Sequence, residues 1–167
     1  MDGNADLNLI LSKALGLEES GLRFFSAMAR LSGDAGSREL FKRLAAEAES
    51  HFYILREAMK RCGYEPVGEP RFGPSDSFTG DAKGTLTGAG PARAMNYAIR
   101  LEQRVVEHYR SSLPHIRIHD VRKVILSLIR FKESHKELLS GQLLRLLDDG
   151  RRCQASFPMA RANASPC

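Results

Sequence analysis

Several residue types are scarce in this sequence of 167 residues, and each scarcity excludes a class of function. The three cysteines, Cys62, Cys153 and Cys167, are far apart and form no C-x-x-C pair, which excludes a zinc ribbon and a rubredoxin-type iron centre. No apolar run reaches the roughly 18 residues that a membrane-spanning helix requires, so we expect no membrane partner. The glycines of residues 73–90 follow no phosphate-loop pattern, and no feature supports a nucleophilic triad.

Neither basic nor acidic residues are clustered in one part of the chain. The chain has 25 basic and 20 acidic residues, a formal net charge of +5, and the two kinds alternate along the predicted helices. This alternation is typical of solvated helix faces, whereas nucleic-acid binding needs a clustered basic stripe, so we expect no nucleic-acid partner. The N-terminus carries Asp2 and Asp6 and only a short apolar stretch, which does not resemble a signal peptide. A cytoplasmic location is therefore the expectation.

What the sequence does contain is helical periodicity. Apolar residues recur every three or four positions in four segments, which form two pairs at about 5–62 and 91–149. This pattern predicts four helices that each turn one stripe inward. Ser37 is a candidate N-cap for the second helix, Gly63 ends it, and Gly90-Pro91 begins the third.

The two helix pairs are separated by residues 63–90, which are rich in glycine, proline and serine. Such a long connection is uncommon in a compact domain, but a four-helix bundle can use it to join two parallel helices. We therefore predict an all-α four-helix bundle over residues 1–149, with one long crossover between helices 2 and 3. Residues 150–167 are predicted to form a polar C-terminal tail.

The two pairs are also internal repeats. His51 follows Glu18 by 33 residues, and His135 follows Glu102 by the same 33. All four residues lie on apolar stripes, where an ionised carboxylate needs a cation to offset the cost of burial. Two copies of a Glu…His unit are what a symmetric two-metal site in a four-helix bundle requires.

The same segments resemble the ferritin-like superfamily, and most closely its rubrerythrin-like proteins. The resemblance is carried by ALGLEESGLRFF (14–25), LAAEAESHFYIL (44–55), AIRLEQRVVEHY (98–109) and LIRFKESHKELL (128–139). It implies a ferritin-like bundle with a di-iron site, built from one Glu on each of two helices and a Glu-x-x-His motif on each of the other two. Glu18 and Glu102 would be the single glutamates, His51 and His135 the histidines, and Tyr109 a weaker candidate beside the metal.

The second glutamate of each motif is missing. Ala48 stands three residues before His51, and Lys132 stands three residues before His135. Glu49 and Glu133, two residues before the histidines, are turned by about 200° and are predicted to face solvent. Glu47 lies four residues before His51 on roughly the same face, but its counterpart is Phe131, so any replacement ligand would serve one half only.

Lys132 has two interpretations. Its stem could lie in the core while its ammonium reaches outward to water. Alternatively, the ammonium occupies the place of a metal and neutralises Glu18 and Glu102, with a protonated histidine balancing the remaining charge.

Two functions follow from these alternatives. The first is a rubrerythrin-like iron oxidoreductase with a mononuclear or dinuclear site, which would need an external electron donor because the rubredoxin-type domain is absent. The second is a metal-free, non-catalytic ferritin-like module that works through a partner or as a homodimer. We expect a homo-oligomer, specifically a dimer.

Overall fold

The computed structural model describes residues 3–65 and 90–155, which form four long helices and one short one. These are α1 (Gly3–Leu31), α2 (Ala35–Arg61), α4 (Gly90–Ser112), the short 3₁₀ helix η2 (Leu113–His115) and α5 (His119–Ala155). Most of the predicted crossover (residues 66–89) and the last part of the predicted tail (156–167) lie outside the described residues.

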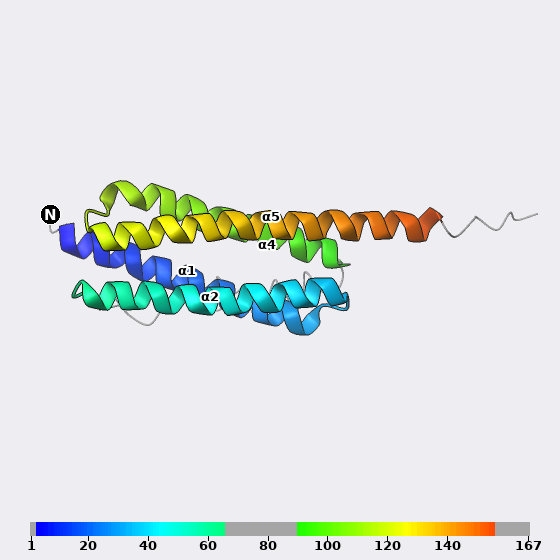
Figure 1. Ribbon diagram of the computed structural model, residues 1–167, viewed down its shortest axis with the longest axis horizontal. Helices are drawn as coiled ribbons and strands as arrows, with labels where there is room; N and C mark the ends of the chain where they lie inside the picture. The colour runs from blue at the N-terminus through cyan, green and yellow to red at the C-terminus, as the bar shows by residue number, and fades with distance from the viewer. Residues whose placement is uncertain (1–2, 66–89, 156–167) are drawn as a thin grey trace, which may run out of the picture.

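The helices form two antiparallel pairs that pack against each other, α1 with α2 and α4 with α5 (Figure 1). Helices α2 and α4 run in the same direction, so the two central helices in chain order are parallel (Figure 1). The described ranges contain no strand. The prediction of an all-α four-helix bundle is confirmed. Within the described residues, no helix is both long and apolar enough to cross a membrane.

The turn between α1 and α2 differs from the prediction. Asp34, rather than Ser37, is the N-cap of α2, and its side-chain oxygen accepts a hydrogen bond from the backbone N–H of Ser37 at 2.6 Å. Ser37 lies inside the helix and is buried, and its hydroxyl oxygen is 3.0 Å from the amide nitrogen of Gln142 in α5. Both residues are good capping types, so residue type alone does not decide between them.

Helix α5 is longer than predicted. The expected boundary between bundle and tail, at residue 150, falls inside α5, which continues to Ala155. Gly150 does not end the helix, and the guanidinium of Arg151 pairs with the carboxylate of Asp148 one turn earlier. With 37 residues, α5 is about 55 Å long, and its C-terminal end extends beyond the other helices (Figure 1).

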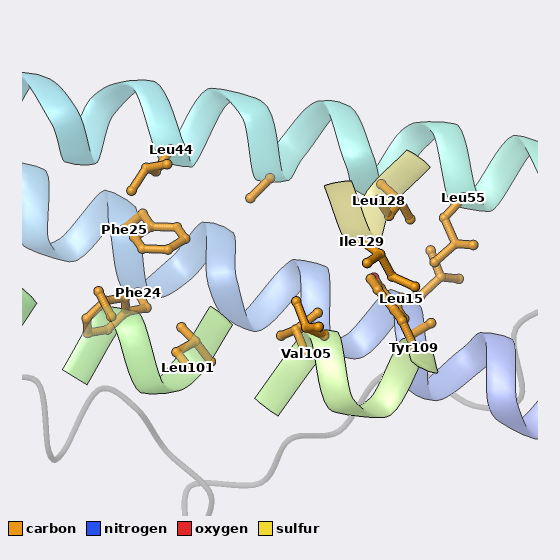
Figure 2. Close-up of a cluster of buried hydrophobic side chains, with 14 of the residues drawn as sticks. Leu15, Phe24, Phe25, Leu44, Leu55, Leu101, Val105, Tyr109, Leu128 and Ile129 are labelled. Atoms are coloured by element: carbon orange, nitrogen blue, oxygen red, sulfur yellow. The ribbon is translucent and has the colours of Figure 1, made fainter. Parts of the chain in front are cut away.

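The predicted stripes form the core. Figure 2 shows Leu15, Leu55 and Tyr109 meeting at one end of a buried cluster, and Phe25 and Leu44 meeting at the other. Leu15 and Phe25 lie before and after Glu18 in α1, and Leu44 and Leu55 lie before and after His51 in α2. Polar groups at the middle positions are therefore enclosed by apolar layers on both sides, which keep water away from them.

Candidate functional site

Six polar side chains from all four long helices meet inside the bundle and are at most 4% exposed. We call them the buried ionic cluster, and they are Glu18 of α1, His51 of α2, Glu102 and Tyr109 of α4, and Lys132 and His135 of α5. The structure thus brings together the four residues that the repeat singled out, and it adds Lys132 and Tyr109 to them.

Lys132 lies between the two carboxylates. Its Nζ is 2.8 Å from Oε2 of Glu18 and 3.4 Å from Oε2 of Glu102. The side chain is about 2% exposed, so its ammonium does not reach outward to water. Both contacts are within the distance of a salt bridge. One positive charge therefore faces two negative ones in a site that excludes water.

The charges hold one another ionised. Burial alone, the largest effect, would raise the pKa of Glu18, but the charge of Lys132 and contacts with His51 outweigh it and lower the pKa to about 2. Burial alone would lower the pKa of Lys132, but Glu18 and Glu102 outweigh it and raise that pKa above 10.5. At neutral pH the pair is therefore a carboxylate and an ammonium.

Tyr109 completes the surroundings of Glu18. Its hydroxyl donates a hydrogen bond to Oε1 of Glu18, while Oε2 of the same carboxylate faces Lys132. Burial and the nearby negative charge of Glu18 raise the pKa of Tyr109 well above 10, so the hydroxyl keeps its proton. Tyr109 thus has a polar role in the cluster in addition to its packing in the core.

His135 connects the cluster to the protein surface. Its Nδ1 lies 3.0 Å from Glu102, and its Nε2 lies 2.6 Å from Oε2 of Glu47. Glu47 is partly exposed, and its other oxygen accepts a hydrogen bond from Nε of Arg43 at 2.7 Å. Carboxylate oxygens accept hydrogen bonds, so both contacts of His135 are satisfied when both of its ring nitrogens carry protons.

The position of Glu47 could not be read from α2 alone. Its spacing to His51 suggested that the two residues of one helix would act together. Instead, Glu47 approaches the histidine of the other half, because α2 packs against α5. Glu49 is exposed, and Glu133 forms surface ion pairs with Arg110 and Lys136, which agrees with their predicted solvent-facing positions.

His51 is the least satisfied member of the cluster. Its Nδ1 lies 3.7 Å from Oε2 of Glu18, too far for a hydrogen bond, and has no other hydrogen-bond partner among the described residues. Its ring packs against Phe131 at 5.0 Å and stacks on His135 at 5.7 Å between ring centroids. Packing therefore holds the ring, and its Nδ1 faces the carboxylate of Glu18 without a hydrogen-bond partner among the described residues.

This donor set does not fit a dinuclear iron centre. The described residues contain no group of three or more His, Cys, Asp or Glu side chains placed to hold a metal ion. Ala48 has no donor atom, and the protonated Lys132 has no free electron pair. An ammonium between the two glutamates also repels a divalent cation electrostatically. The assignment of Glu18, His51, Glu102 and His135 as metal ligands remains a prediction.

Comparisons with known proteins identify the fold of this chain and do not assign a chemical activity to it. No protein-family model matches the sequence, and no curated protein matches it. One similar solved structure is a two-domain protein from Anabaena variabilis that contains DJ-1/ThiJ/PfpI-like and ferritin-like domains, with a TM-score of 0.64 and 13% sequence identity. The match covers 98% of this chain and 41% of that protein, so this chain spans less than half of its length. The fold is therefore ferritin-like.

The ionic contacts predict how stability depends on pH. A carboxyl group whose pKa falls from 4.5 to about 2 on folding adds stability above pH 4.5, and this stability is lost as the pH falls toward 2. Urea unfolding across this window should show a smaller loss for Glu18→Gln than for the wild type. The control Glu39→Gln, at an exposed surface pair, should behave as the wild type does. Equal slopes for Glu18→Gln and the wild type would contradict the ion pair.

Removal of the internal cation should destabilise the bundle. Lys132→Met leaves two buried carboxylates without a positive charge, so we expect the free energy of unfolding to fall by about 3–5 kcal/mol at pH 7. The control Lys42→Met removes an exposed ion pair and should cost less than about 1 kcal/mol. The loss in Lys132→Met should shrink at pH 5, because the carboxyl groups can then protonate. A loss at pH 7 no larger than that of the control would refute this account.

Proposed function

We propose that this chain is a metal-free, non-catalytic ferritin-like module, in which the ammonium of Lys132 takes the place of metal cations beside Glu18 and Glu102. The observation that carries the proposal is the position of Nζ, 2.8 Å from one carboxylate and 3.4 Å from the other. A buried carboxylate pair needs positive charge, and here the chain supplies that charge itself.

Lys132 and a divalent metal ion would compete for the two carboxylates. A divalent ion could bind both glutamates only if Lys132 moved away, which would leave a buried ammonium without its counter-ions at a cost of several kcal/mol. The glutamates that usually bridge two metals would not offset this cost, because Ala48 and Lys132 occupy their positions. The ion pair is therefore favoured over metal binding.

The cluster would serve to fix the arrangement of the helices. Its contacts join α1 to α5 through Glu18 and Lys132, α4 to α5 through Glu102, and α1 to α4 through Tyr109. A shift of α1, α4 or α5 by a turn would leave a buried charge unpaired. We infer a role in specifying one helix register more than in adding net stability, as a buried Asn does in some coiled coils.

The module would act through a partner or as a homodimer. The Anabaena variabilis protein carries its ferritin-like domain beside a DJ-1/ThiJ/PfpI-like domain, which supports the use of this fold as one module among others.

An iron oxidoreductase is the second candidate, and the Nδ1 of His51, which has no hydrogen-bond partner among the described residues, favours it. With Lys132 turned aside, Glu18, Glu102, His51 and His135 would be the ligands, and an external protein would supply electrons.

Iron analysis separates the two functions. After anaerobic loading with ferrous iron and desalting, the wild-type protein should retain less than about a tenth of an equivalent, because Lys132 competes for the carboxylates. Ala48→Glu/Lys132→Glu restores both family glutamates and should retain iron. The control Ala46→Glu/Lys42→Glu makes the same changes at exposed positions of α2 and should not.

Tight binding of two irons by the wild-type protein, with consumption of peroxide that is lost in Glu18→Ala, would overturn the metal-free module and establish the oxidoreductase. The wild-type measurement decides this even if the buried Ala48→Glu substitution prevents folding.

A further inference from the structure

Helix α5 carries an exposed face that no other described helix covers. We call Glu137, Gly141, Leu144, Leu147 and Arg151 the outer α5 face, and all five residues are exposed. Leu144 is 62% exposed and Leu147 is 47% exposed. Two large apolar side chains one turn apart form a small apolar patch that a second helix could cover.

The face points away from the bundle. Leu144 follows the fully buried Leu139 by five residues, which turns it by about 140° from the core direction. Glu137, Leu144 and Arg151 are spaced by seven residues, so each points about 20° from the next, and all three lie within about 40° of one another. Seven-residue spacing on a helix face is the pattern through which two helices pack along their length.

Gly141 has no explanation within the described part of the chain. A glycine inside a helix costs roughly 0.5–1 kcal/mol relative to alanine. A Cβ atom added at Gly141 would meet no atom within 4 Å, so no neighbour within the described residues requires glycine there. A second helix packed closely against this face could use the space, because the missing side chain makes room for a large one.

We propose that the outer α5 face binds the same face of a second copy of this chain, with the two α5 helices antiparallel about a two-fold axis at Leu144. This axis places Leu144 against Leu144 of the second copy. It places Leu147 of each copy over the space at Gly141 of the other, and Glu137 of each copy opposite Arg151 of the other.

Charge selects this arrangement. Glu137 lies seven residues before Leu144 and Arg151 lies seven residues after it, so the antiparallel pairing brings opposite charges together at both ends. A parallel pairing would place like charges together. Within one chain Arg151 pairs with Asp148, but this exposed contact contributes little and leaves Arg151 free to exchange partners.

The overall shape permits the contact. Because the outer α5 face lies opposite the core side of the helix, the two bundles would lie on opposite sides of the helix pair. The C-terminal end of α5 already extends past the other helices, so a second α5 can lie along it (Figure 1). The surface shares no residue with the buried ionic cluster, and the inference does not depend on the metal-free function.

Charge reversal tests the pairing. In sedimentation equilibrium, the wild type should be a dimer, while Glu137→Arg and Arg151→Glu alone should each weaken dimerisation at least about tenfold by placing like charges together. An equimolar mixture of the two variants should recover the dimer, because every contact then pairs opposite charges. The control Glu49→Arg makes the same charge change on α2 and should leave the dimer intact. Circular dichroism checks the fold of each variant.

Gly141 gives an independent measurement. Gly141→Gln should weaken dimerisation by filling the space for Leu147, while it raises the helix stability of the monomer. Gly150→Gln makes the same change on another face of α5 and should leave dimerisation unchanged. A monomeric wild type at about 100 µM would overturn the proposal and leave the face to a different partner. A dimer unaffected by the single charge reversals, or a mixture that stays monomeric, would also overturn it.

Discussion

The ion pair between Lys132 and the two buried glutamates is the interaction on which the interior of this bundle depends. Glu18 and Glu102 come from different helix pairs, and both are buried. Without a cation between them, two negative charges would repel each other in a medium that screens poorly. The ammonium of Lys132 turns this repulsion into attraction that draws α1, α4 and α5 together. The helices of the core can therefore pack closely only when Lys132 neutralises the two glutamates.

The internal repeat has diverged around this ion pair. One half carries the neutral Ala48 and the other the positively charged Lys132 at matching positions, so the two halves differ in charge there. Glu47 compensates across the halves, because it contacts His135 and extends the cluster to the partly exposed edge of α2. The result is an asymmetric set of charges within a nearly symmetric arrangement of helices.

Much of the fold could be predicted because it depends on local pattern. Spacings of three and four residues fixed the four stripes, and the short turn after Leu31 made α1 and α2 antiparallel. The N-cap at Asp34 and the extension of α5 to Ala155 could not be predicted in the same way. Ser37 and Asp34 are equally suitable caps by type, and a single exposed glycine such as Gly150 does not reliably end a helix.

The sequence by itself determined which residues share the interior, since the repeat identified Glu18, His51, Glu102 and His135 and marked Lys132 as the anomaly. Only the tertiary structure decided how they pair. The direction of the Lys132 side chain, the hydrogen bond from Tyr109 to Glu18 and the contact of Glu47 with His135 all join residues on different helices. Periodicity gives the face on which a residue lies. The distance between charges on two faces depends on how the helices pack, and that distance decides which charges pair.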